Sequence, residues 1–232
     1  MDNLVAFIFA RGGSKKLPKK NIKNFNGLPL IAHTINLAKK SKLFSDIVVS
    51  TDDQEIADTA KEFGANVPFL RPKDLAEDNS PEWLCWKHAI NKYNKKIDHF
   101  FSLPCTSPLK SITDLEKMID FYKRDEFDLV LGISSTNHSP YFNMVTRDIN
   151  NRVMRISDPD YPINRRQDAP ECFNITTVGY LSNPKYILRE ENIFSGNVGG
   201  IEIPKERSID IDDEIDFFIA ESLSKRNNNY EK

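Results

Sequence analysis

The sequence predicts a single α/β domain whose core is a mostly parallel β-sheet, and three observations support this. Apolar runs of strand length occur at residues 4–10, 46–51 and 128–134, as expected for strands buried on both faces of a sheet. Segments with helix signals lie between these runs, which is the order of right-handed βαβ units. The length of 232 residues suits one domain with a full hydrophobic core.

Start and stop signals place the elements in order along the chain. Pro29 opens the first helix, Asp53 caps the second and Gly64 ends it, and Ser80 with Pro81 begins the third. We expect strands at residues 4–10, 46–51, 66–70, 99–103, 128–134, 173–181 and 199–203, and helices at 29–40, 53–63, 80–93, 111–124 and 214–225.

The composition limits the classes of partner. Hydrophobic residues make up 39% of the chain and charged residues 28%, which is ordinary for a folded protein and argues against disorder. A net charge of −2 argues against a general nucleic-acid-binding protein. We therefore expect any basic stretch to be local and its partner to be a small anion.

The cysteines indicate the compartment. Cys85, Cys105 and Cys172 are odd in number, lie far apart and form no CxxC pair. This usage fits a reducing compartment and argues against a zinc site. The first apolar run is too short to span a membrane, and no basic segment precedes it as a signal peptide requires. We expect a cytoplasmic protein without a membrane partner.

The alternation of strands and helices stops at residues 139–172. This stretch is polar and irregular, with turn signals at Asn150-Asn151 and Asp158-Pro159. A break of this kind in an α/β pattern predicts an inserted flap or an oligomerisation arm within one domain covering residues 1–232.

Glycines and positive charges follow the first predicted strand. Gly12 and Gly13 allow a sharp turn or a close approach to a ligand, just beyond a strand's carboxyl end, where open α/β sheets bind ligands. Lysines there would offset the charge of a polyphosphate. Neither GxxxxGK[ST] nor GxGxxG is present. We expect phosphate binding, with a basic surface loop as the alternative; the polar residues are Arg11, Ser14, Lys15, Lys16, Lys19 and Lys20.

Paired aspartates mark the other end of the chain. In the stretch SIDIDDEID, residues 208–216, alternation in an extended segment places Asp210 and Asp212 on one face. Two neighbouring carboxylates favour a cation, and hard oxygen ligands suit Mg²⁺, which takes its other ligands from water and substrate phosphates. Helix capping by Asp212 or Asp213 is the alternative, but it does not explain Asp210.

Six motifs in order resemble the acylneuraminate cytidylyltransferases, also called CMP-sialic acid synthetases, over nearly the whole chain. They are ARGGSKKLPKKNIKNFNGLPLIAHTI, IVVSTDDQEIADTAKEFGA, FLRPKDLAEDNSP, CTSPL, RQDAPE and SIDIDDEID. The resemblance implies a Rossmann-like three-layer α/β sandwich of the nucleotide-diphospho-sugar transferase type, with a small inserted dimerisation arm. It also implies a homodimer that transfers CMP from CTP to the anomeric hydroxyl of a nonulosonic acid, with Mg²⁺ required and pyrophosphate released.

The resemblance assigns roles to matching positions. It implies catalytic roles for Arg11, Lys20 and Asp212, with Lys20 stabilising charge on the α-phosphate as pyrophosphate leaves, and metal binding by Asp210 and Asp212. An arginine such as Arg166 can grip a carboxylate in a fork of two hydrogen bonds. The sugar site implied is Thr106, Arg166, Gln167 and Asn174. The nucleotide site implied is Arg11, Gly12, Gly13, Ser14, Lys15, Lys20, Asn21, Arg71, Asp78, Asn79 and Ser80.

Two departures concern the sugar. Pro104 stands where sialic acid enzymes usually carry glutamine, and Asn174 stands where they carry arginine. The runs SPYFNM and RQDAPECFN look more like the branch that acts on legionaminic acid and related diamino nonulosonates. The resemblance therefore implies a legionaminic-type acceptor over N-acetylneuraminate.

The expected mechanism is an in-line attack of the sugar's anomeric oxygen on the α-phosphorus of CTP, in which positioning and charge stabilisation dominate. One alternative is a cytidylyltransferase for an eight-carbon 3-deoxy sugar acid, whose loop pattern differs from this one. Another is a non-catalytic nucleotide-binding homologue, against which Lys20, Asp210 and Asp212 argue. A metal-dependent glycosyltransferase would carry its D-x-D nearer the middle of the sheet.

Overall fold

A six-stranded sheet forms the centre of the computed structural model, which describes residues 1–124, 126–158 and 161–230. Strand β9 runs antiparallel to both of its neighbours, and every other neighbouring pair in this sheet is parallel. This confirms the predicted mostly parallel α/β fold. In spatial order the strands are β10 (Val198–Glu202), β6 (Leu129–Ser135), β9 (Phe173–Ser182), β5 (His99–Ser102), β1 (Leu4–Phe9) and β4 (Asp46–Ser50).

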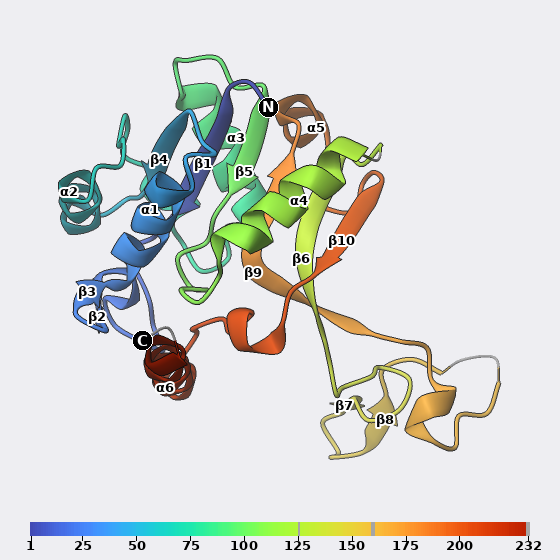
Figure 1. Ribbon diagram of the computed structural model, residues 1–232. Coiled ribbons are helices and arrows are strands. Elements are labelled where there is room, and N and C mark those ends of the chain that lie inside the picture. Colours follow the sequence, from blue (N-terminus) through green and yellow to red (C-terminus); the bar gives the residue numbers. More distant parts are fainter. Residues whose placement is uncertain (125, 159–160, 231–232) are drawn as a thin grey trace.

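Helices cover both faces of this sheet and complete a three-layer sandwich (Figure 1). Alternate residues of β1 enter opposite cores because successive side chains of a strand point to opposite faces. Ala6 packs with helices α1 (Leu30–Ser41), α2 (Gln54–Glu62) and α4 (Ile112–Arg124). Phe7 packs with α3 (Glu82–Lys92) and α5 (Pro184–Arg189). Both tryptophans of the chain lie on α3 and are buried in this core.

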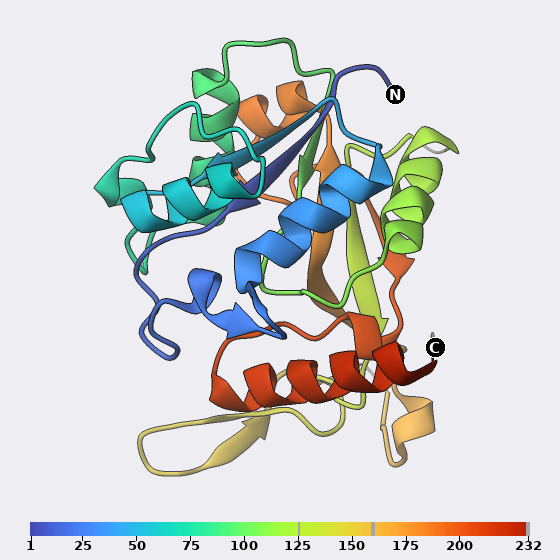
Figure 2. The same cartoon turned by 60° about the vertical axis from the view of Figure 1, so that its left-hand side comes forward.

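A third, smaller core joins the two ends of the chain. Helix α6 (Glu214–Tyr230) lies against the hairpin of β2 (Asn24–Phe25) and β3 (Leu28–Pro29), below the hairpin in Figure 2. The rings of Phe25 and Phe217 meet edge to face, 5.5 Å apart. The core also buries Leu17, Leu30, Ile211 and Ala220. It therefore fixes the segment before α6 beside the loop that follows β1.

The chain between β6 and β9 leaves the sheet as an arm (Figure 1). It contains the short hairpin of β7 (Val145–Arg147) and β8 (Val153–Arg155) and the 3₁₀ turn η3 (Arg166–Asp168). Every residue of β7 and β8 is exposed. The excursion predicted at 139–172 falls in this segment, and its residues 159 and 160 lie outside the described part.

Two local expectations are wrong. Residues 66–70 form only isolated bridges at Asn66 and Leu70, because Pro68 between them has no backbone N–H for a ladder. Ser80 does not cap α3, since its hydroxyl donates to the carbonyl of Asp74 and the helix begins at Glu82 without a side-chain cap. By contrast, Asp53 caps α2 as expected.

Among the helices of the described residues, none is both long and apolar enough to cross a membrane.

Candidate active site

The candidate site lies at the carboxyl edge of the sheet, where the loops after β1, β4, β5, β6 and β10 meet. Parallel strands present their carboxyl ends to the same edge, so residues distant in sequence gather there. The loop after β1 carries Arg11 to Lys20, and the loop after β5 carries Thr106. The segment after β10 carries Asp210 and Asp212.

The loop after β1 is closed by the side chain of Asn21, which is only 6% exposed. Its amide nitrogen donates to the carbonyl of Arg11 over 2.9 Å. Its amide oxygen accepts from the thiol of Cys105 over 3.1 Å, and burial raises the pKa of that thiol to about 11, which keeps the donor protonated. Asn21, which is predicted to contact the nucleotide, therefore also holds the shape of the loop.

Lys20 connects this loop to the segment before α6. Its side chain, 12% exposed, donates to the carbonyl of Ile211 over 2.6 Å and lies 3.2 Å from a carboxylate oxygen of Asp212. The backbone N–H of Ile211 in turn donates to the carbonyl of Thr106 over 2.9 Å. The predicted catalytic lysine and metal carboxylates are therefore held together at one edge of the sheet.

Asp78 forms ion pairs with two other basic side chains of the loop. Arg11 lies 2.8 Å from Asp78, and Lys15 pairs with the second oxygen of the same carboxylate. Lys15 and Arg11 lower the pKa of Asp78 below its usual value. The N–H of Gly12 donates to Asp52 over 3.0 Å, so that amide is already used within the protein.

A cavity of about 330 Å³ opens between these groups. Seven predicted residues line it: Arg11, Lys20, Asn21, Arg71, Asp78, Ser80 and Thr106. Gly13, Lys15 and Asn79 line a neighbouring depression together with Asp78. Ser14 is half-buried in the same loop. Glu82, Cys85 and Thr177 also line the smaller cavity, and the sequence analysis assigned no role to them there.

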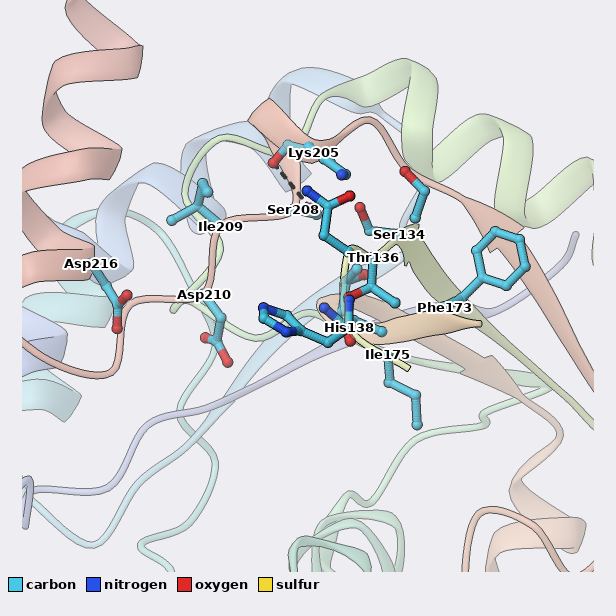
Figure 3. A pocket seen from close by; sticks show the side chains of 14 residues that line it. Ser134, Thr136, His138, Phe173, Ile175, Lys205, Ser208, Ile209, Asp210 and Asp216 are labelled. Atoms are coloured by element: carbon cyan, nitrogen blue, oxygen red, sulfur yellow. Dashed lines mark hydrogen bonds between the residues drawn. The ribbon is translucent and has the colours of Figure 1, made fainter. Parts of the chain in front are cut away.

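A larger cavity of about 790 Å³ is lined on one side by Ser208, Ile209 and Asp210 of the segment before α6 (Figure 3). Asp210 and His138 point into it in this view, and Asn174 lines it from the start of β9. Sequence reasoning missed Ser134, Thr136, His138 and Lys205, although the position of the first three at the end of β6 is a signal that could have found them.

The arm meets the rim of this larger cavity. Arg166 donates to the carbonyl of Thr136 and to the side-chain oxygen of Asn137, each over 3.0 Å. Both partners line the larger cavity, whereas Gln167 is exposed and lines neither cavity. Of the four predicted sugar residues, Asn174 lines the larger cavity, Arg166 reaches its rim and Thr106 lines the smaller one.

Of the three aspartates before α6, Asp213 caps the helix, and Asp210 and Asp212 are the candidate metal ligands. Asp213 caps α6 by accepting from the N–H groups of Ile215 and Asp216 over 2.9 and 3.1 Å. Asp210 has a buried carboxylate oxygen with no hydrogen-bond partner among the described residues. The described residues contain no group of three or more metal-ligating side chains. Two carboxylates with an unpaired oxygen fit Mg²⁺, which takes few protein ligands and keeps water and phosphate oxygens.

A buried ion pair holds this segment on the body of the protein. Arg207 donates two hydrogen bonds of 2.9 Å to Asp114, whose side chain is almost fully buried at the start of α4. Arg207 belongs to the 3₁₀ turn η4 (Lys205–Arg207), directly before the aspartates. Removing one partner of such a pair leaves a buried charge uncompensated, so this contact fixes where Asp210 lies.

The chain matches a known protein family over most of its length. The family model described as Cytidylyltransferase matches residues 5–217. This chain belongs to the cytidylyltransferase family. The matched span includes Arg11, Lys20, both candidate metal aspartates and the whole arm.

Two relatives of this cytidylyltransferase are similar over nearly their full length. It is 34% identical over 227 residues to a CMP-N,N'-diacetyllegionaminic acid synthase of Campylobacter jejuni, covering 96% of this chain and 95% of the relative. It is 32% identical over 230 residues to a pseudaminic acid cytidylyltransferase of the same species, covering 98% of each.

A solved structure shares the fold. The CMP:2-keto-3-deoxy-manno-octonic acid synthetase complexed with CTP superposes with a TM-score of 0.75 at 16% identity, covering 97% of this chain and all of that one. At this identity the likeness shows the fold alone.

Lys110 is a buried cation of this cytidylyltransferase that holds the loop after β5. Its ammonium donates to the carbonyls of Pro104 and Ser107 over 2.5 and 2.8 Å. Burial lowers the pKa of Lys110 to about 8, although Asp210 and Asp114 counteract part of the effect. A neutral amine still carries two N–H donors for these two carbonyls, so deprotonation does not require the loop to open.

We predict that the buried charge of Lys110 lowers the free energy of unfolding, and that this effect depends on pH. The unfolded pKa of lysine is about 10.4, so between pH 8 and 10.5 the unfolded chain holds a proton that the native protein has lost, and stability rises with pH. The free energy of unfolding of the wild type, minus that of Lys110→Met, should increase by about 3 kcal/mol over this window. Urea unfolding at pH 7, 8, 9 and 10 measures it.

The matched control is Lys117→Met, which removes an exposed lysine from the same region of the chain. Its difference from the wild type should stay constant with pH. A difference for Lys110→Met that is flat, or that shrinks as pH rises, contradicts the assignment of a charged buried lysine.

Proposed function

We propose that this protein transfers CMP from CTP to the anomeric hydroxyl of a nonulosonic acid and releases pyrophosphate. The observation that carries the proposal is the contact of Lys20, which lines the smaller cavity, with the segment before α6, which lines the larger one. Each cavity would take one of the two substrates. The names of the relatives, which are synthases and cytidylyltransferases of nine-carbon acids, support the same reaction. They favour it over the eight-carbon acid and over a non-catalytic homologue.

The nucleotide would occupy the smaller cavity. Its triphosphate competes with Asp78 for Arg11 and Lys15, and exposed ion pairs of that kind are exchanged at little cost. Lys20 then lies at the boundary between the cavities, where positive charge stabilises the α-phosphate as the bond to pyrophosphate breaks.

The acceptor would occupy the larger cavity. Arg166 and Lys205 would bind its carboxylate through their positive charges. Asn174, Ser134 and Thr136 would form hydrogen bonds with its hydroxyl and amide groups. The anomeric oxygen bonds to the α-phosphorus in line with the departing pyrophosphate and loses its proton to water. The protein contributes by holding both reactants in this alignment.

Asp210 and Asp212 would hold a Mg²⁺ ion at this boundary. The unpaired oxygen of Asp210 and the position of Asp212 beside Lys20 support the assignment. When bound, the ion supplies positive charge to oxygens of the triphosphate. Arg207 and Lys110 keep the two aspartates and the Thr106 loop in place around it.

We propose that the acceptor is an acid of the legionaminic type. Asn174 in the larger cavity, where the sialic acid enzymes are expected to carry arginine, supports an acceptor different from N-acetylneuraminate. The relatives named for legionaminic and pseudaminic acid are 34% and 32% identical, which supports the same class of diamino acids.

We also propose a homodimer in the cytoplasm. The arm exposes apolar residues that the single chain leaves uncovered, including Ile149 at 97% and Val153 at 62% exposure. A second copy of this chain would cover them, as the family resemblance implies. Free Cys85, Cys105 and Cys172 suit the reducing cytoplasm, where CTP is available.

The central prediction is a requirement for three components. With CTP and Mg²⁺, pyrophosphate release should occur with legionaminic, pseudaminic or sialic acid, fastest with the first, and not with the eight-carbon acid or without an acceptor. Chelation of Mg²⁺ should abolish it. A coupled phosphate assay measures the rates, and equal turnover of the eight-carbon acid would show that the acceptor class is wrong.

A matched pair of variants tests the metal residues within this assay. Asp212→Asn should lower kcat by at least about a hundredfold while the protein remains folded, because a neutral amide binds Mg²⁺ poorly. Asp120→Asn, an exposed aspartate on α4, should turn over like the wild type. Normal turnover by Asp212→Asn excludes it as a metal ligand.

The arm predicts the state of assembly. Val153→Asp places a charge among the exposed apolar side chains of the arm, at the start of β8, so it should convert a dimer to a monomer with unchanged circular dichroism. Leu188→Asp, on α5 and away from the arm, should remain a dimer. Sedimentation velocity distinguishes the two, and a monomeric wild type would overturn the proposed homodimer.

A further inference from the structure

The loop after β5 connects two segments of the proposed site that lie far apart in the sequence. On one side, the carbonyl of Thr106 accepts from the N–H of Ile211, in the segment before α6, over 2.9 Å. On the other side, the Sγ of Cys105 lies 3.1 Å from the side-chain oxygen of Asn21, the residue that closes the loop after β1. Cys105 is only 1% exposed and lines the smaller cavity. The proposed reaction assigns it no role.

The orientation of the Asn21 amide is fixed by its other partner, the carbonyl of Arg11. A carbonyl can only accept a hydrogen bond, so the amide nitrogen of Asn21 must lie on that side. The amide oxygen therefore faces Cys105 and needs a donor there. The thiol supplies this donor, whereas an apolar side chain would leave a buried oxygen unpaired. Cys105 thus stabilises Asn21 in the orientation that holds Arg11.

Asn21 holds one side of a single peptide unit, the one between Arg11 and Gly12. The carbonyl of this unit accepts from Asn21 over 2.9 Å, and its N–H donates to Asp52 over 3.0 Å. Because a peptide unit is planar, these two contacts fix its orientation. Gly12 is also packed closely against the cap of α2, since a Cβ at this position would lie 2.7 Å from a carboxylate oxygen of Asp53. The orientation of this peptide sets the direction in which the side chain of Arg11 enters the smaller cavity.

We propose that Cys105 is a positioning residue for the triphosphate of the nucleotide. Its thiol holds Asn21, and Asn21 holds the peptide between Arg11 and Gly12 in the orientation that binds phosphate. This inference deepens the proposed function and rests on it. A loop that is already fixed binds a polyphosphate without the entropic cost of ordering its charged side chains. Cys105 therefore contributes to the affinity for the nucleotide and not to that for the acceptor.

Two variants of Cys105 that differ by one hydroxyl group test the role of the donor. Cys105→Ala removes the donor and should raise the Kd of CTP, measured with Mg²⁺ by isothermal titration calorimetry, about tenfold. Cys105→Ser keeps an O–H donor, so it should bind CTP within about threefold of the wild type. In the turnover assay, Cys105→Ala should raise KM for CTP and leave KM for the acceptor unchanged, which a general loss of stability would not do. Cys172→Ala removes a thiol that lines neither cavity and should bind CTP like the wild type.

A double-mutant cycle tests whether Cys105 acts through Asn21. Asn21→Ala removes the group that connects Cys105 to the loop after β1, so it should itself weaken the binding of CTP. Adding Cys105→Ala to this variant should not raise the Kd of CTP further, because no buried amide oxygen remains to be paired. Effects of the two substitutions that multiply independently would overturn the inference, as would an Asn21→Ala protein with the affinity of the wild type.

Cys105→Val is a second donor-free variant, which fills the volume of the thiol if the alanine variant does not fold, and it should weaken CTP binding equally. Wild-type affinity for CTP in a folded Cys105→Ala or Cys105→Val protein overturns the inference, while turnover by the wild type leaves the proposed reaction intact. Weaker binding that Cys105→Ser restores supports the inference even if no acceptor is turned over, in which case only the proposed transfer fails. A wild type that binds no CTP overturns both.

Discussion

The contact between Lys20 and the segment before α6 is the interaction on which the site depends. It joins Lys20 to the carbonyl of Ile211 and the carboxylate of Asp212, which lie 191 and 192 positions further along the chain. The small core around Phe25 and Phe217 supports it by burying apolar side chains from both ends of the chain. Without this core, the basic loop and the aspartates would belong to separate surfaces.

In the absence of a ligand, the charges of this site pair with one another. Asp78 holds Arg11 and Lys15, and Asp212 holds Lys20. These pairs are mostly solvent-exposed, and exposed pairs contribute at most about 1 kcal/mol each. A triphosphate and a cation can exchange for them at little cost, whereas the buried pair of Arg207 and Asp114 stays as the fixed support beneath.

Much of this arrangement could be predicted from local sequence. The apolar run that became β1, the glycines after it and the cap at Asp53 each follow from neighbours within a few residues, and the structure confirms these elements. The choice of Asp213 over Asp212 as the cap of α6 could not be decided from sequence, because both lie at capping distance from the helix start.

What could not be predicted depends on contacts across the fold. Neither the two-residue strands of the hairpin β2–β3 nor the short helix α5 has a periodic pattern of sufficient length. Glu82 reads in the sequence as an ordinary first-turn acid of a helix. Only the folded chain brings it opposite Arg71, and only the folded chain shows that Asn21 holds the loop.

A crystal structure of the protein with CTP and Mg²⁺ is the most direct test of how this site binds its substrate. We expect electron density for the base in the smaller cavity and for the α-phosphate beside Lys20, with the metal between the phosphates and the pair Asp210 and Asp212. Phosphates bound away from both Lys20 and these aspartates would contradict it, and only the fold and the family would then stand.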